Sequence, residues 1–319
     1  MDKIEYFELA TEKYKKKDYK GAIGYYNKFI ELNPELSSAY YNRALAKADF
    51  KDYKGALADY NKALELNPKD VEAFNNRGFV KAKLNDFEGA IADFDEALEL
   101  RPDFVMAYFN RGHEKLQLGD YENAIPDFDK AILLKPKYKS AHYFRGYAKY
   151  KLENYEEAIK DFDIVITIEP DNEDSYFTRG NAKYKSDDFE NAVNDYKKVI
   201  ELNSDNIPAY LKKGEALAKM GLDSEAQEDY KTIIKKVEKM LKRNPKAIAL
   251  YIWRAKAKVR TEQYEEAFAD YGIAVKLHSK EQLKKSYKEI LAAYAELKEK
   301  CPKLSERINQ LLIQIRKAL

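Results

Sequence analysis

The chain has few of the residues from which covalent cross-links and metal sites are built. Its 319 residues include one cysteine, Cys301, and three histidines, His113, His142 and His278. A single cysteine excludes an internal disulfide framework. The histidines are scattered, and none belongs to an HExxH motif or has a cysteine partner, so no metal site is indicated. We therefore expect no metal and no cofactor.

The sequence also has no large excess of either charge and no long apolar run. The 57 basic and 55 acidic residues leave a net charge of only +2, so nucleic acid is not an expected partner. No run of about 18 apolar residues is present, and a membrane span is not expected. The first residues have no apolar signal-peptide core, and the expected location is cytoplasmic.

Prolines are few, but they are regularly spaced. Five of the nine stand 34 residues apart, and these are Pro34, Pro68, Pro102, Pro136 and Pro170. A period of 20–50 residues indicates one supersecondary unit stacked many times, and 34 residues suit a helix–turn–helix pair. Such stacks usually present a surface rather than a pocket of reactive groups. A further proline, Pro126, falls in a second helix, where we expect it near the first turn because a missing N–H costs least there.

The same spacing runs through the apolar residues of both helices in each unit. A small residue in the first helix allows the neighbouring helix to approach closely. In the second helix an alanine is followed, four residues later, by an aromatic residue on the same face. The small residues are Ala10, Ala44, Gly78, Gly112, Gly146, Gly180, Gly214 and Ala255, and the aromatic residues are Tyr26, Tyr60, Phe94, Phe128, Phe162, Tyr196, Tyr230 and Tyr271.

This pattern resembles the tetratricopeptide repeat (TPR) over roughly residues 3–278. The resemblance implies an all-α fold, a right-handed superhelical α-solenoid of about eight repeats whose first helices line a concave groove. Seven extra residues before Pro245 predict a longer second helix in the seventh repeat. The expected repeats are 3–36, 37–70, 71–104, 105–138, 139–172, 173–206, 207–247 and 248–278.

Residues 279–319 depart from the repeat and are expected to form C-terminal capping helices. Ser279 and Gln282 fit a capping box that begins a helix ending near Lys300. Pro302 breaks this helix, and a last helix follows. Terminal repeats need a covered end, so we expect these helices to cover the last repeat. A homo-oligomer contact through them is the alternative.

Arginines and aspartates recur together in the repeats. The arginine precedes the small residue of the first helix, and the aspartate follows the alanine of the second helix by three residues. The first repeat lacks both, which suggests that the two residues pair between the helices of one repeat. A motif repeated in this way favours a structural use over a row of catalytic acids. The expected structural ion pairs are Arg43–Asp59, Arg77–Asp93, Arg111–Asp127, Arg145–Asp161, Arg179–Asp195 and Arg254–Asp270.

The first helices also carry residues that could line the implied groove. Aromatic residues not needed between helices suggest a surface that binds an apolar or aromatic segment, and asparagine can hydrogen-bond a peptide backbone. Some of these aromatic residues are expected to fill spaces between adjacent first helices instead. The candidate groove residues are Tyr41, Asn42, Asn76, Phe79, Phe109, Asn110, Tyr143, Tyr147, Phe177 and Asn181.

Two functions from different classes fit the sequence. The leading hypothesis is a non-catalytic scaffold or adaptor whose groove binds a peptide segment of another protein. The alternative is a structural protein that self-associates through its terminal helices. No nucleophile, acid–base pair or phosphate-binding loop is recognisable, so we do not expect an enzyme.

Overall fold

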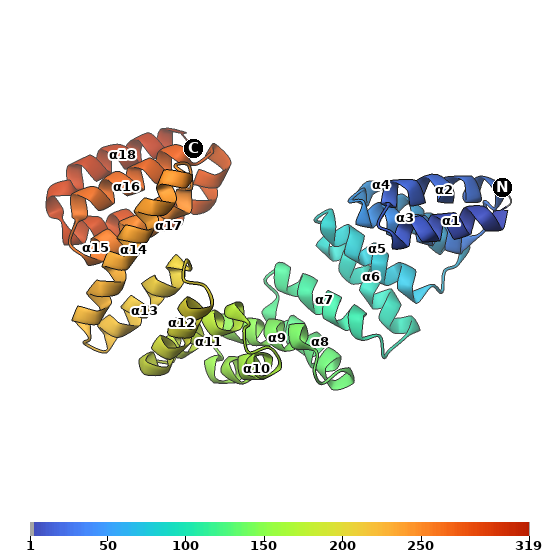
Figure 1. The fold of residues 1–319 in the computed structure, drawn as a ribbon, viewed down its shortest axis with the longest axis horizontal. Coiled ribbons are helices and arrows are strands. Elements are labelled where there is room, and N and C mark those ends of the chain that lie inside the picture. The colour runs from blue at the N-terminus through green and yellow to red at the C-terminus, as the bar shows by residue number, and fades with distance from the viewer. Residues whose placement is uncertain (1–2, 319) are drawn as a thin grey trace. The chain divides into compact units, whose positions relative to one another are not determined.

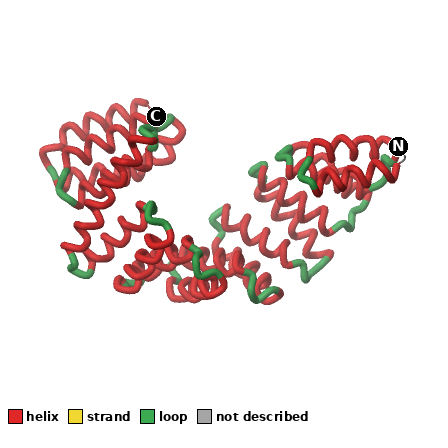
Figure 2. Tube along the Cα trace, viewed as in Figure 1, coloured by secondary structure: helices red, strands yellow, loops and turns green. Residues whose placement is uncertain are grey.

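The structure, a computed structural model, describes residues 3–318 of the chain. Figure 2 shows helices joined by short turns, and no strand occurs between residues 3 and 318. The chain divides into two compact units, Met1–Ile168 and Glu169–Leu319. Within each unit, consecutive helices pack against each other (Figure 1). The predicted all-α solenoid of stacked helix pairs is confirmed.

First and second helices alternate along both units. The helices of the first unit are α1 (Lys3–Lys15), α2 (Tyr19–Leu32), α3 (Ser37–Asp49), α4 (Tyr53–Leu66), α5 (Val71–Lys83), α6 (Phe87–Leu100), α7 (Val105–Gln117), α8 (Tyr121–Leu134), α9 (Lys139–Lys151) and α10 (Tyr155–Ile168). Those of the second unit are α11 (Glu173–Lys185), α12 (Phe189–Leu202), α13 (Ile207–Lys219), α14 (Asp223–Arg243), α15 (Ile248–Arg260), α16 (Tyr264–Leu277), α17 (Lys280–Lys300) and α18 (Ser305–Ala318), with a short 3₁₀ turn at Pro302–Leu304.

A left-handed residue turns the chain between the two helices of each pair. Its φ lies between 61° and 80°, and glycine, which tolerates this conformation best, stands there only as Gly119 and Gly221. The residue after it forms hydrogen bonds with both helices, as Asp52 illustrates. Its N–H donates to the Lys47 carbonyl oxygen (2.8 Å), and its carboxylate accepts from the Gly55 N–H (3.0 Å). The turn therefore ends α3 and caps α4.

The small residue of each first helix lies against the aromatic ring of the paired second helix. A Cβ atom added at Gly78 would lie 2.7 Å from Cε1 of Phe94, and one added at Gly214 would lie 2.7 Å from Cε1 of Tyr230. The eight aromatic residues at this position are 0–5% exposed. The close approach that the sequence predicts is therefore the core contact of each helix pair.

The second helix of the seventh repeat has the predicted extra length. α14 has 21 residues, whereas α12 and α16 have 14 each. Val237 and Leu241 are buried along its added turns and continue the buried face that includes Ile233. Since two extra helical turns preserve the buried face, the insertion lengthens the helix without disturbing its packing.

The expectation for Pro126 was wrong. It is the sixth residue of α8 and exposed, one turn beyond the positions whose N–H groups lack a helical partner. A residue with an N–H at this position would bond to the carbonyl oxygen of Glu122, and proline leaves that bond unmade. The carbonyl lies on the exposed side of the helix, where water can satisfy it.

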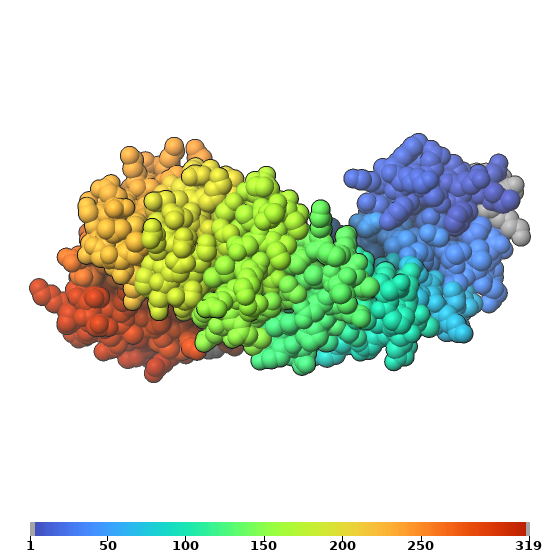
Figure 3. Space-filling view, turned by 90° about the horizontal axis from the view of Figure 1, so that it is seen from below, coloured from blue at the N-terminus to red at the C-terminus, as the bar shows by residue number. Residues whose placement is uncertain are grey.

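The C-terminal helices have the predicted boundaries and a shared core. The Ser279–Gln282 capping box begins α17. Leu297, Leu304 and Ile308 are completely buried in this region. Figure 3 shows the successive helices of the second unit as adjoining bands that run from yellow-green to red.

Candidate functional site

The structure brings together the arginine and aspartate of each expected pair. Arg43 illustrates the geometry, since its Nε and Nη2 donate to the two carboxylate oxygens of Asp59 at 2.8 and 2.6 Å. The six aspartates are 1–4% exposed. The Nη2–carboxylate distances are 2.6 Å for Arg43–Asp59, 2.7 Å for Arg77–Asp93, 2.5 Å for Arg111–Asp127, 2.5 Å for Arg145–Asp161, 2.6 Å for Arg179–Asp195 and 2.5 Å for Arg254–Asp270.

Each of these aspartates also binds a lysine, which the sequence analysis missed. The lysine stands four residues after the arginine on the same helix, a spacing that could have revealed it. Two cations therefore neutralise and hydrogen-bond each buried carboxylate. The distances are 2.7 Å for Lys47–Asp59, 2.9 Å for Lys81–Asp93, 2.7 Å for Lys115–Asp127, 2.9 Å for Lys149–Asp161, 2.9 Å for Lys183–Asp195 and 2.9 Å for Lys258–Asp270.

The arginine also reaches the preceding repeat, so it does more than pair two helices. Nη1 of Arg111 binds Asp95 on α6 at 2.6 Å, and Nη1 of Arg43 donates to Asn27 on α2 at 2.8 Å. Burial opposes the charged form of Arg111, but its bonds to Asp127 and Asp95 hold its pKa above the ordinary value. Arg77 and Arg145 make the corresponding contacts with Asn61 and Asp129, so each of these four arginines connects three helices from two consecutive repeats.

The seventh repeat departs from this arrangement. Lys213 replaces the arginine and binds one oxygen of Asp229 at 2.8 Å, while Leu217 replaces the second cation. Within the described part of the chain, the other oxygen, Oδ2, is buried without a hydrogen-bond partner. Burial raises the pKa of the Asp229 carboxyl, against the opposing effect of Lys213.

Several candidate groove rings of the first unit pack inside their own repeat. Tyr41 lies edge-on to Tyr60, with ring centres 5.9 Å apart, and Tyr143 lies edge-on to Phe162 at 5.7 Å. Phe109 contacts Tyr138 at 5.0 Å. These rings are half-buried, so one face of each is committed to the helix pair and only part remains for a ligand.

The asparagines of the first unit form a hydrogen-bonded chain across three first helices. Asn76 donates to the hydroxyl of Tyr41 (3.0 Å), and Asn75 donates to Asn76 (3.2 Å). Asn110 donates to Asn75 (3.0 Å). Asn42 lies outside this chain, because its amide donates to the Ser38 carbonyl oxygen of its own helix (2.7 Å). We call Tyr41, Asn76, Asn75 and Asn110 the asparagine ladder.

An aromatic cavity opens between α7 and α9. It has a volume of about 430 Å³ and is lined by Leu116, Gln117, Tyr121, Tyr143, Phe144 and Tyr147. The Lys151 ammonium lies 5.3 Å from the centre of the Tyr147 ring. Phe79, on α5, is 44% exposed, with the Lys83 ammonium 4.9 Å from its ring centre. The cavity is thus a place in the first unit where aromatic side chains surround open space.

Two candidate residues belong to the second unit. The Phe177 ring centre lies 5.9 Å from that of Tyr196, and the Asn181 side-chain oxygen accepts from the Tyr196 hydroxyl at 2.9 Å. Both contacts join the two helices of one pair.

A metal site and a membrane span are both absent from residues 3–318. No cluster of three or more histidine, cysteine or acidic side chains that could hold a metal ion occurs there. In the same range no helix combines the length and the apolar character that crossing a bilayer requires.

Family models match most of the chain. A model described as "TPR repeat" matches residues 51–85, 146–187 and 180–221. Two models described as "Tetratricopeptide repeat" match residues 71–104 and 105–138 in one case and 6–36 in the other. Together they cover more than half of the sequence, and the chain belongs to the tetratricopeptide repeat family. No curated protein sequence matches it.

Solved structures of other proteins share this architecture. A TPR protein from Parabacteroides merdae, 20% identical, covers 81% of this chain and 98% of its own length with a TM-score of 0.62. MamA, 25% identical, covers 55% of this chain and 95% of its own with a TM-score of 0.53. YrrB, described as "a TPR protein with an unusual peptide-binding site", is 24% identical and covers 58% and 95%, with a TM-score of 0.53.

Proposed function

We propose that the chain is a non-catalytic protein-interaction scaffold whose first unit binds a peptide segment of a partner protein. The observation that carries this proposal is the cavity of about 430 Å³ between α7 and α9, because four of its six lining residues are aromatic. Partly exposed aromatic rings around an open cavity are the usual anchors of protein–protein binding.

The asparagine ladder supports a peptide ligand in particular. An asparagine amide offers two N–H donors and an acceptor oxygen. Asn110 uses one donor for Asn75, which leaves its remaining polar atoms for a peptide backbone. Three residues along the chain, His113 continues this surface, with its ring 5.0 Å from Phe144.

The terminal helices suit the role of a cap. We take residues 3–278 as the repeat array and 279–319 as its covering helices. The exposed side of α18 is mostly polar, with Glu306, Asn309, Gln310 and Gln314, and it includes one apolar residue, Ile313, which is 53% exposed. A mostly polar outer face is what the end of a repeat array requires.

A binding experiment with one groove variant tests the proposal. Peptides of about twelve residues are selected from a random display library on the full chain and then measured against Tyr147→Ala. Loss of a hot-spot aromatic residue should weaken their binding by about 30-fold, equivalent to ~2 kcal/mol. Phe50→Ala is the control, since Phe50 is a 53% exposed ring outside the cavity and its loss should leave affinity unchanged.

Three results would contradict this function. The library could enrich no peptide, the two variants could lose equal affinity, or Tyr147→Ala could unfold the first unit. The last result would mean that Tyr147 belongs to the core. Tyr143 is a poorer choice for this test, because its contact with Phe162 ties it to stability.

A further inference from the structure

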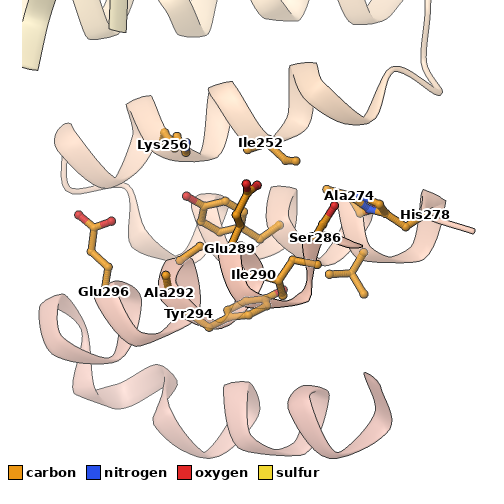
Figure 4. Close-up of a pocket in the computed structure, with 13 residues that line it drawn as sticks. Ile252, Lys256, Ala274, His278, Ser286, Glu289, Ile290, Ala292, Tyr294 and Glu296 are labelled. Atoms are coloured by element: carbon orange, nitrogen blue, oxygen red, sulfur yellow. The ribbon is translucent and has the colours of Figure 1, made fainter. Parts of the chain in front are cut away.

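A second cavity lies in the second unit, between α15, α16 and α17. Its volume is about 290 Å³. Figure 4 shows Ile252 and Lys256 on one helix facing Ile290 and Tyr294 on another. We call this cavity the C-terminal pocket. It is lined by Ile252, Lys256, Tyr271, Ala274, Val275, His278, Ser286, Glu289, Ile290, Ala292, Ala293, Tyr294 and Glu296.

The walls of the C-terminal pocket are largely apolar. Ile252, Val275 and Ile290 are only partly buried, although all three pack against the C-terminal core. The Tyr294 ring beside them is 1% exposed. The volume is just below the range of roughly 300–1,000 Å³ that is usual for small-molecule sites. It suits one or two apolar side chains.

The pocket exists because of α17, a helix outside the repeat pattern. Seven of the thirteen lining residues come from α17, including Ile290, Ala293 and Tyr294. The repeats alone would leave this face of α15 and α16 without an opposite wall. The helix that caps the array therefore also builds a recess on it.

Two further cavities adjoin the C-terminal pocket in sequence. One, of about 190 Å³, shares Lys256 and Glu296 with it. The other, of about 530 Å³, shares Glu215 and Arg260 with the one of 190 Å³ and extends to Tyr184 on α11. We call the three cavities together the run, and a ligand that occupied all of it would be elongated.

Charges of both signs line the run in nearly equal number, with Lys219, Lys256 and Arg260 against Glu215, Asp223, Glu289 and Glu296. Arg260 forms an ion pair with Glu296, and Lys212 binds Glu215 at 2.8 Å. A surface on which positive and negative charges nearly balance offers hydrogen bonds without strong net attraction for an anion or a cation. It suits an uncharged polar chain such as a peptide backbone, and it does not suit a polyphosphate or nucleic acid.

We propose that this run is a second peptide site, in which the C-terminal pocket takes one apolar anchor side chain of leucine or phenylalanine size. The flanking peptide backbone then lies over Lys256, Arg260 and Glu215. This inference rests on the proposed function for the kind of partner, but it assigns a separate site in the second unit.

Methyl-detected NMR of the full chain tests the anchor directly. The probe is N-acetyl-leucine N-methylamide, and the methyl signals of Ile252, Val275 and Ile290 report on the pocket walls. We expect saturable shifts of these signals, at least tenfold weaker binding to Ala293→Trp, and unchanged binding to Ala295→Trp. Ala295 is the matched control, because it is exposed on the same helix outside the pocket. A second variant, Ile290→Ala, removes a wall without adding bulk and should also weaken binding.

A longer probe tests whether the ligand is a peptide. A capped peptide of about seven glycine and serine residues with one central leucine should bind at least threefold more tightly than capped leucine, since its flanks reach the adjoining cavities. Equal affinities, binding of decanoate but not of either peptide probe, or no response in the three methyl signals would overturn the proposal. Tyr147→Ala should leave these shifts unchanged. A negative result for the second-unit site can therefore be distinguished from a negative result for the first-unit site.

Discussion

At the scale of single residues, the core ring of each second helix is tyrosine in some repeats and phenylalanine in others. The hydroxyl of Tyr196 has a partner, since it donates to the Asn181 side-chain oxygen at 2.9 Å. The hydroxyl of Tyr230, at the same position one repeat later, is buried without a hydrogen-bond partner in the described part of the chain. Phe94, Phe128 and Phe162 show that the ring alone satisfies the packing.

Replacing Tyr230 by phenylalanine should therefore stabilise the chain. Removing a buried, unpaired hydroxyl recovers its desolvation cost, which we place at about 1 kcal/mol. Urea denaturation followed by circular dichroism measures the change. Tyr196→Phe is the matched control and should destabilise by a similar amount, because it leaves Asn181 without its donor. Destabilisation by both changes would show that the Tyr230 hydroxyl has a partner after all.

At the scale of helices, one residue departs from the helix-forming pattern of the repeats, and it is Pro126 in α8. α8 has the same length as α6, 14 residues, yet it carries a proline in its interior. The neighbouring helix has Ala92 at the equivalent exposed position. The repeat architecture accepts Pro126 because the lost bond is on the outer side of the helix and not in the core.

Pro126→Ala should raise stability by about 1–3 kcal/mol, since the helix gains the bond from residue 126 to the Glu122 carbonyl. The thermal midpoint of the full chain is the measurement. The reciprocal change, Ala92→Pro in α6, should lower stability by about 3 kcal/mol. If Pro126→Ala lowers the midpoint instead, the restriction that proline places on the unfolded chain outweighs the missing bond.

At the scale of the whole molecule, buried tyrosines make stability depend on alkaline pH. Burial raises the pKa of Tyr230 to about 12 and also raises those of Tyr60, Tyr271 and Tyr294. Unfolded tyrosine has a pKa of about 10. Above that pH the unfolded chain releases protons that the folded chain keeps, so the unfolded state is favoured.

Stability from these groups is therefore complete below about pH 10 and is lost as pH rises toward 12 and beyond. Each tyrosine contributes a slope of about 1.4 kcal/mol per pH unit within this window. Denaturation series between pH 8 and pH 12 measure this slope, and tyrosinate absorbance is followed in parallel. Tyr294→Phe should flatten the dependence, and a pH-independent free energy of unfolding would contradict the prediction.

The sequence by itself determined the architecture, because its signals are periodic and local. Regular prolines, small residues opposite aromatic rings and the Ser279–Gln282 box each act within one helix or one helix pair. The spacing between Arg111 and Asp127 likewise predicts a contact inside one repeat. These features depend on helical geometry that every repeat shares, and so they could be read without the fold.

Tertiary structure decided how much of each side chain is exposed and where cavities form. Tyr41 and Asn76 look equally available in the sequence, but the distance between adjacent first helices makes them partners of each other. The bond from Arg111 to Asp95 depends on how one repeat stacks on the next. The C-terminal pocket depends on how α17 packs on α15 and α16, a contact between elements that no repeat period describes. Cavities of this kind are set by distances between helices, and these arise only when the whole chain is packed.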